Sequence, residues 1–250
     1  MLDDLWTQLL TTFPGGRLAL FVAGMSVAYI GVYVAAVAMF QLAHRRGWWA
    51  RYLFEDGRPP PDKLMRRAYR EVVRDSLPAP LMGVALFYLY DAVGMRYEAP
   101  LPGPLEILGQ LALFILVEDT LFYWSHRLLH RPWWFRKVHA HHHRFKATRA
   151  IAVLFTHPVE TLFNAVAMLA GPALLSTHVV TFWIWVALRM WETADAHSGF
   201  TLPISRPWAP MHAWHHRYVH GCYGSFFGLW DRLMGTDEGY RAWKTEQAKP

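Results

Sequence analysis

Residues 18–40 read LALFVAGMSVAYIGVYVAAVAMF, a stretch of 23 residues without a charged side chain. A helix of this length spans the roughly 30 Å of hydrocarbon in a bilayer, so we expect a transmembrane helix here. The composition agrees, since hydrophobic residues make up 54% of the chain and charged residues 18%. Ordinary globular proteins have about 45–50% and 25%. These values exclude a disordered regulator and argue against an ordinary soluble enzyme.

Three further apolar stretches follow, at about 77–95, 105–124 and 161–188. The last of them has no Lys, Arg, Asp or Glu and contains Gly171-Pro172 near its middle, where we expect a sharp bend. We therefore predict that 161–188 is a hairpin that enters and leaves the membrane on one side. At the N-terminus, apolar residues at helical spacing (Leu2 to Phe13) predict an interfacial helix, although a packed core helix fits equally well.

Basic residues are concentrated next to the first span. Residues 41–75 contain nine Arg and Lys, and residues 127–149 are basic again. The positive-inside rule places both segments in the cytoplasm and the N-terminus outside. The net charge of +6 forms no single stripe, so we expect no nucleic-acid partner.

These segments predict an all-α integral membrane protein with about four membrane helices or helical hairpins and a cytosolic histidine-rich di-metal lobe. We expect an interfacial helix at 1–16 and transmembrane helices over 17–125, with a basic cytoplasmic loop at 41–76. A catalytic region at 126–250 would include the membrane hairpin 161–188.

Histidine is the unusual residue of this chain: there are 14, and all except His44 lie between His126 and His220. They form three clusters, HRLLH (126–130), HAHHH (139–143) and HAWHH (212–216). In the first, a spacing of four residues puts both imidazoles on one helix face. The other two share the form H-x-x-H-H, which suggests two halves of one site.

Metal binding is the interpretation that best explains these clusters. Any one of them could be a chance surface pattern, but eight crowded imidazoles would repel one another as neighbouring charges unless they bound metal. Neutral imidazole suits Zn, Cu, Fe and Ni, and eight ligands exceed what one ion needs, so two metals are implied. The single cysteine, Cys222, excludes an internal disulfide and an iron–sulfur cluster.

At this point the chain resembles the fatty acid hydroxylase/sterol desaturase superfamily of membrane di-iron enzymes, and most of all its C-4 methylsterol oxidase branch. The resemblance lies in VEDTLFYWSHRLLH (117–130), the HPVETL and ETADAHSGF runs, and HHRYVHGCYGSFFGLWDRLMGTD (215–237). Arg144, Ala140 and Cys222 depart from the sterol-oxidase pattern at positions beside the clusters.

The resemblance implies two iron ions, replaceable by zinc, with dioxygen as co-substrate and an external electron donor of the cytochrome b5 or ferredoxin type with its reductase. Carried over by position, the metal ligands would be His126, His130, His139, His142, His143, His212, His215 and His216, with His197 as a ninth and His157 as a tenth. His157 could equally be an interfacial histidine without a metal.

Four carboxylates are candidates to hydrogen bond the ligating histidines. Asp119 lies seven residues before His126 on the same helix face, Glu118 directly precedes Asp119, and Glu192 and Asp195 precede His197. Helix capping or pairing with Arg is the alternative for all four. Four aromatic residues could line a substrate pocket, although core packing is the simpler role for most: Tyr223, Phe226, Phe227 and Trp230.

The sequence therefore indicates an oxygenase that oxidises an unactivated C–H bond of a lipid, with a C-4 methyl group of a sterol as the favoured target. Ring desaturation of a sterol, or hydroxylation of a fatty acyl chain or carotenoid, would use the same metal site. A histidine-rich metal transporter is the alternative from another class. We expect an integral membrane protein whose site faces the cytoplasm, in the endoplasmic reticulum of a eukaryote or the inner membrane of a bacterium.

Overall fold

The computed structural model describes residues 1–55, 58–205 and 208–247, and every regular element within these ranges is helical. The expected all-α fold is confirmed. The α-helices are α1 (Leu2–Thr12), α2 (Gly16–Ser26), α3 (Val32–Arg46), α4 (Asp62–Ser76), α5 (Ala79–Ala92), α6 (Pro104–Leu129), α7 (Pro132–Lys137), α8 (Pro158–Leu174), α9 (Val179–Ala196), α10 (Ala209–Tyr218), α11 (Leu229–Met234) and α12 (Glu238–Gln247). Short turns labelled η join several of them, and η3 (His139–Arg144) carries part of the site.

The uncharged stretch 18–40 lies inside one continuous helix from Gly16 to Arg46. It consists of α2, a single π turn at Val27–Gly31, and α3. The helix ends at Gly47, whose φ of 67° is left-handed and therefore suits glycine. Its last turn is basic, which favours the negative end of the helix dipole.

Fewer helices than expected are clear candidates for membrane spans. In the described part of the chain, only Gly16–Arg46 is a helix long and apolar enough to cross a membrane unaided. The pair α4 and α5 would make a second span if their 45° bend lies within one crossing, and α8 is apolar but shorter. The count of about four spans is therefore not confirmed.

Large apolar side chains are nevertheless exposed along several helices. They lie on the long N-terminal helix and on α5, α6 and α8, and include Val27, Val34, Leu81, Leu89, Leu105, Leu108, Leu116, Leu162, Val166 and Leu174. Exposed apolar patches on this scale mark a contact with lipid or with another protein.

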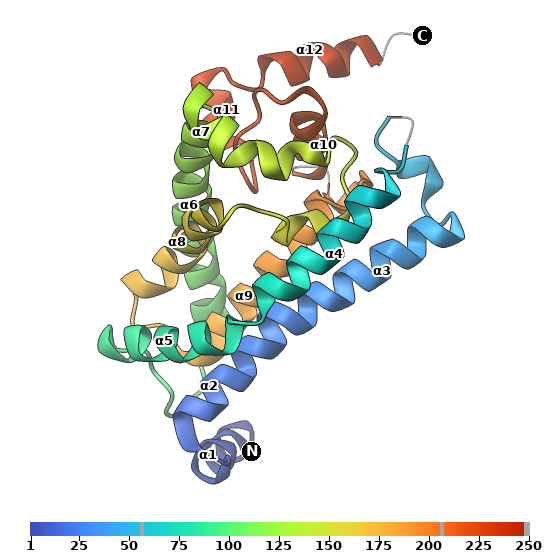
Figure 1. Ribbon diagram of the computed structural model, residues 1–250. Coiled ribbons are helices and arrows are strands. Elements are labelled where there is room, and N and C mark those ends of the chain that lie inside the picture. Colours follow the sequence, from blue (N-terminus) through green and yellow to red (C-terminus); the bar gives the residue numbers. More distant parts are fainter. Residues whose placement is uncertain (56–57, 206–207, 248–250) are drawn as a thin grey trace.

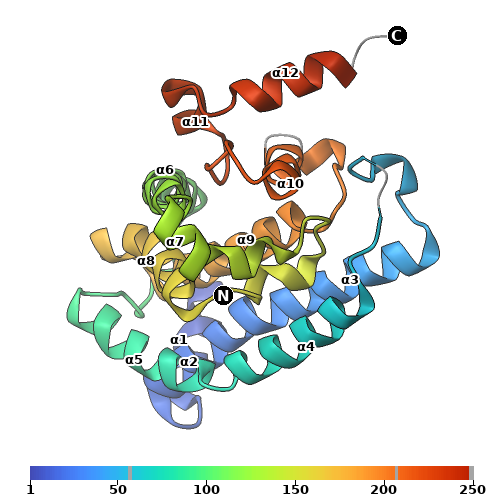
Figure 2. The same ribbon diagram turned by 45° about the horizontal axis from the view of Figure 1, so that its top comes forward.

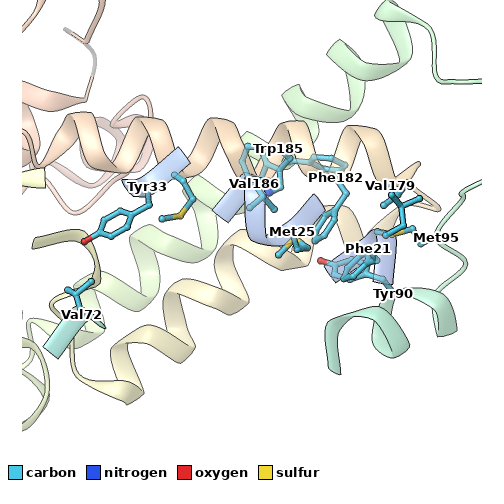
Figure 3. Close-up of a cluster of buried hydrophobic side chains, with 14 of the residues drawn as sticks. Phe21, Met25, Tyr33, Val72, Tyr90, Met95, Val179, Phe182, Trp185 and Val186 are labelled. Atoms are coloured by element: carbon cyan, nitrogen blue, oxygen red, sulfur yellow. The ribbon is translucent and has the colours of Figure 1, made fainter. Parts of the chain in front are cut away.

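Helix α9 lies at the centre of the apolar core. Its Phe182 stacks on Phe21 of α2 with ring centroids 5.7 Å apart, and packs on Tyr90 of α5 at 4.5 Å. Figure 3 shows these side chains gathered with Trp185 of α9 and Met25 of α2. The indole N–H of Trp185 donates to the carbonyl of Met168 in α8 at 2.8 Å, so α9 is attached to its neighbour as well.

Residues 161–188 form parts of α8 and α9, but the predicted position of the bend is wrong. Pro172 lies inside α8, which continues to Leu174, and the break falls at residues 175–178. His178 starts α9, with its Nδ1 accepting the N–H of Val180 at 3.2 Å. Pro172 has no N–H to donate to the carbonyl of Met168, four residues earlier, and the indole N–H of Trp185 donates to that carbonyl instead, which offsets the loss inside α8.

The helices are arranged with the two chain ends far apart. Figure 1 shows α1 at one end of the molecule and α11 and α12 at the other. Figure 2 shows α10, α11 and α12 together on one side of the remaining helices. The C-terminal end of α6 reaches this second region, where the histidines are.

Candidate metal centre

Nine histidines gather into two groups, in each of which the candidate ligand atoms lie within 4.8 Å of one another. The five-histidine group consists of His126, His130, His139, His143 and His215, and the four-histidine group of His142, His197, His212 and His216. The structure therefore brings together His197 and the eight histidines of the three clusters that were predicted as metal ligands.

Local helical geometry distributes each H-x-x-H-H motif between both groups. In η3, His139 and His143 belong to the five-histidine group, whereas His142 points to the other. In α10, residues 212 and 216 share a helix face and belong to the four-histidine group, whereas His215 belongs to the five-histidine group. Each motif gives two histidines to one group and one histidine to the other. The repeated motif thus joins the two groups into one centre.

The Nε2 atoms point inward in the five-histidine group. Nε2 of His139 lies 3.1 Å from Nε2 of His126 and 3.0 Å from Nε2 of His143. Nε2 of His215 is 3.1 Å from that of His143. Nε2 of His130 is buried and, among the described residues, has no hydrogen-bonding partner.

The four-histidine group has the same arrangement. Nε2 of His197 lies 3.1 Å from Nε2 of His142 and 2.8 Å from Nε2 of His212. Nε2 of His216 is 3.1 Å from that of His212. The ligand atoms therefore converge from η3, from the end of α9 and from α10.

Backbone carbonyls fix which nitrogen carries the proton in five of these rings. The Nδ1–H groups donate to carbonyl oxygens, and a carbonyl can only accept, so each Nε2 of a neutral ring is left with a lone pair. The donors and their acceptors are His126 to Tyr223 (3.0 Å), His142 to Phe155 (3.4 Å), His197 to Thr193 (2.8 Å), His215 to Gly221 (2.6 Å) and His216 to Phe145 (2.9 Å).

This set of donors fits metal ions. Two lone pairs that face each other at 3.1 Å, as in His142 and His197, repel unless a cation lies between them. Metal–imidazole bonds of about 2.0–2.1 Å place two ligands of one ion about 3 Å apart, which is the spacing found here. Burial also lowers the pKa of His142 to about 3 and of His197 to about 4, so both rings stay neutral and able to bind metal.

The loop after α10 contacts the Nδ1 side of two of these rings. Carbonyls of Gly221 and Tyr223 accept from His215 and His126. Asp231, which is fully buried, accepts the backbone N–H groups of Tyr223 and Gly224, each at 2.7 Å. Gly221 has a φ of +66°, and a Cβ there would lie 2.4 Å from the carbonyl oxygen of Thr236, so the loop requires glycine.

The comparisons with known proteins agree with this geometry. The fatty acid hydroxylase family matches residues 111–236, which include all nine histidines. Methylsterol monooxygenase 2-2 of Arabidopsis thaliana is 33% identical over 96% of this chain and 93% of its own length. Very-long-chain aldehyde decarbonylase GL1-8 of Oryza sativa subsp. indica is 32% identical over 99% and 96%. The chain belongs to the fatty acid hydroxylase family. The resemblance predicted from the sequence is confirmed, and no solved structure matches the chain.

The four predicted carboxylates support helices and a loop. Glu118 accepts from Arg189 at 2.8 Å, and Arg189 also donates to Glu192, so the trio ties α6 to α9. Asp119 accepts the N–H groups of Ser225 and Phe226, both at 3.0 Å, and Asp195 accepts the indole N–H of Trp208. Among the described residues none of the four bonds a ligating histidine, which corrects the role expected for Asp119.

The carboxylate that does reach a histidine was missed. Oε2 of Glu160 lies 3.0 Å from Nδ1 of His139, and both side chains are buried. Glu160 belongs to the HPVETL run that the sequence singled out for its resemblance. An acidic residue in the first turn of a helix is usually explained by its favourable interaction with the helix dipole. The contact of Glu160 with His139 therefore could not be recognised from its position in the sequence.

The remaining histidines lie outside the two groups. Nδ1 of His157 accepts the N–H of Val159 at 3.2 Å, so this side chain caps α8. His141 stacks on Phe155 and places Nε2 3.0 Å from Oε2 of Glu71 in α4. His44 bonds the carbonyl of Ser198 at 2.8 Å. The two groups of the candidate metal centre therefore comprise nine histidines.

The aromatic residues expected at the substrate pocket differ in position. The ring of Tyr223 lies 4.9 Å from that of His130, next to the five-histidine group. Phe226 is buried against Trp185 and the guanidinium of Arg189. Trp230 donates to Thr120 at 3.0 Å, whereas Phe227 is exposed. Tyr223 is thus the one of the four in contact with ligating histidine rings.

Proposed function

We propose that this member of the family is a membrane-bound di-iron oxygenase that uses dioxygen to oxidise an unactivated C–H bond of a lipid. The C-4 methyl group of a sterol is the favoured target. The observation that carries the proposal is the pair of adjoining histidine groups, in which buried Nε2 lone pairs converge at spacings of 2.8–3.1 Å.

The chain supplies ligands, orientation and a dry environment. Reduction of dioxygen and oxidation of a C–H bond are chemistry that iron bound by these imidazoles would provide. Backbone carbonyls of Phe155, Thr193 and Gly221 each hold one ring in a single tautomer, so these ligands need no rearrangement when metal binds. His142, His143, His212, His215 and His216 are all buried, which excludes bulk water.

A sterol substrate is supported by the similarity to methylsterol monooxygenase 2-2 along nearly the whole chain. Oxidation of a methyl group consumes dioxygen, two electrons and two protons, and yields the alcohol and water. Two further oxidations give the aldehyde and the acid. The apolar side chains exposed on α5, α6 and α8 would let a substrate arrive from the lipid phase.

The electrons require an external donor, for which we propose a cytochrome b5- or ferredoxin-type protein with its reductase. The basic residues that follow Gly16–Arg46 support a cytoplasmic location for this end of the helix and, with it, for the histidines. The membrane would be the endoplasmic reticulum in a eukaryote or the inner membrane in a bacterium.

The test is turnover by purified, iron-loaded protein in lipid with a 4-methylsterol, dioxygen and a reducing system. The expected products are the 4-hydroxymethyl and 4-carboxy sterols, analysed by mass spectrometry. Ring desaturation, or turnover of acyl lipids or carotenoids alone, would reject the sterol methyl group and keep the oxygenase. Metal that is bound without any dioxygen-dependent turnover would favour the transporter.

A second candidate substrate is a very-long-chain aldehyde. It is favoured by the relative GL1-8, whose identity of 32% over 99% of this chain nearly equals that of the monooxygenase. Incubating the same preparation with a long-chain aldehyde separates the two. Formation of an alkane without oxidation of the sterol would replace the first proposal by the second.

A further inference from the structure

One buried carboxylate distinguishes the two histidine groups. Only 3% of Glu160 is exposed, and its Oε2 lies 3.0 Å from Nδ1 of His139. Neither of these two atoms meets hydrogen-bond geometry with any described residue, so the 3.0 Å contact is the polar contact that each makes. Each polar atom therefore depends on the other to offset the loss of water on burial.

The direction of this contact follows from the other side of the same ring. Nε2 of His139 faces Nε2 of His126 and of His143 at 3.1 and 3.0 Å, so it is the nitrogen that would bind metal. Nδ1 then carries the hydrogen and faces the carboxylate. A carboxylate in this position fixes the ring's tautomer and orientation, and makes the imidazole a more basic ligand.

The four-histidine group has no equivalent contact in the described chain. His142, His197 and His216 all direct Nδ1 to neutral backbone carbonyls. With metal ions bound, a carboxylate at Glu160 would therefore act through a ligand of the five-histidine group alone. A more basic ligand favours the higher oxidation state of its metal ion, so the two ions would differ in reduction potential.

Glu160 is also held on a rigid element. It lies in the first turn of α8, a helix capped by His157 and attached to α9 through Met168 and Trp185. We propose that Glu160 is a positioning residue that orients His139 and makes the five-histidine subsite the electron-rich member of an unequal metal pair, the one with the lower reduction potential. This inference rests on the proposed function, in which the histidines bind two iron ions.

The experiment uses the full-length protein in detergent, loaded anaerobically with ⁵⁷Fe(II) and studied by Mössbauer spectroscopy and redox titration. Glu160→Gln keeps an oxygen that can accept from Nδ1 and removes only the charge. It should retain both irons, change the spectrum of one, and raise the midpoint of one of the two one-electron steps. Restoring the charge with Glu160→Asp should return that midpoint toward the wild-type value.

A second variant and a control separate electronic from structural effects. Glu160→Ala should weaken the binding of one iron about 10–100-fold and leave the other unchanged. Asp195→Asn is the matched control, because this buried carboxylate contacts Trp208 and no ligating histidine in the described chain. It should leave both iron spectra and both midpoints unchanged.

Several outcomes would overturn the inference. Two equivalent irons in the wild type, unchanged spectra and midpoints in Glu160→Gln, or equal shifts at both irons would each reject it while the di-iron function stands. A wild-type chain that binds no iron would reject the proposed function itself. If Glu160→Ala does not fold, the near-isosteric Glu160→Gln still decides the question.

Discussion

Nε2 of His142 lies 3.1 Å from Nε2 of His197, although 55 residues separate them in the chain. Those residues include the whole of α8 and the whole of α9. Because Glu160, near the start of α8, contacts His139, and His197 follows the end of α9, both ends of this helix pair meet the same centre. The chain therefore runs away from the histidine groups along α8 and back to them along α9.

The first prediction separates neighbouring histidines of one motif. His142→Ala removes one ligand of the four-histidine group, so we expect metal content to fall from about two ions per chain toward one, with loss of activity. His141→Ala should spare most of both, because His141 contacts Glu71 and Phe155 instead. Elemental analysis of the purified variants measures this. Equal losses from the two variants would contradict the assignment of the motif.

The second prediction concerns the loop behind the metal ligands. Asp231→Ala leaves the N–H groups of Tyr223 and Gly224 without their acceptor, which costs about 2–4 kcal/mol of unfolding free energy. Metal affinity should fall too, since this loop supplies the carbonyl that holds His215. Thermal unfolding in detergent and metal titration measure both effects.

Asp75→Ala is the matched control for that loop variant. Asp75 is an exposed carboxylate whose partner is the adjacent Arg74, so its loss should change stability by less than about 1 kcal/mol. If the two variants lowered the melting temperature equally, the loop would not depend on Asp231.

The helices and the grouping of the histidines could be predicted from the sequence because both follow short-range rules. An uncharged stretch of bilayer length becomes a helix, and histidines at spacings of three and four share a site across two turns. The partners of the Nδ1 atoms, which lie on the opposite side of each ring from the proposed ligand atom, could not be predicted this way. Tyr223 offers His126 a backbone carbonyl, which every residue has, and Glu160 meets His139 from a separate helix.

The position of the hairpin break shows a similar limit. Gly171-Pro172 is a strong local signal for a bend, yet Gly171 packs so closely on Phe114 of α6 that a Cβ would lie 2.9 Å from its Cα. The glycine is thus explained by helix packing, and α8 continues past it to Leu174. Only the partner helix reveals this reason.

The third prediction concerns pH. In the folded, metal-free chain, burial lowers the pKa of His142 to about 3 and of His197 to about 4, from the ordinary 6.5. The unfolded chain therefore binds more protons between about pH 6.5 and these values, and the free energy of unfolding falls as the pH is lowered through this window. Each such histidine contributes about 1.4 kcal/mol per pH unit.

Melting temperatures of metal-stripped protein in detergent at pH 7.5 and 5.5 test this. We expect a lower value at pH 5.5, and a smaller difference in His142→Gln, which lacks one of the titrating rings. A melting temperature that stays constant or rises on acidification would show that these rings are already protonated in the folded chain.

The last prediction concerns topology. A single metal centre requires that residues before α8 and after α9 lie on one side of the membrane, so cysteines at Lys146 and at Ile204, both exposed, should react with an impermeant maleimide from the cytoplasmic side. A cysteine at Gln8, which is exposed in α1 before the span Gly16–Arg46, should react only from the opposite side. The native Cys222 is buried, and burial raises the pKa of its thiol, so it should stay unlabelled. If the Lys146 and Ile204 variants were labelled from opposite sides, the histidines near these two positions would lie on opposite sides of the membrane. That result would reject the single centre.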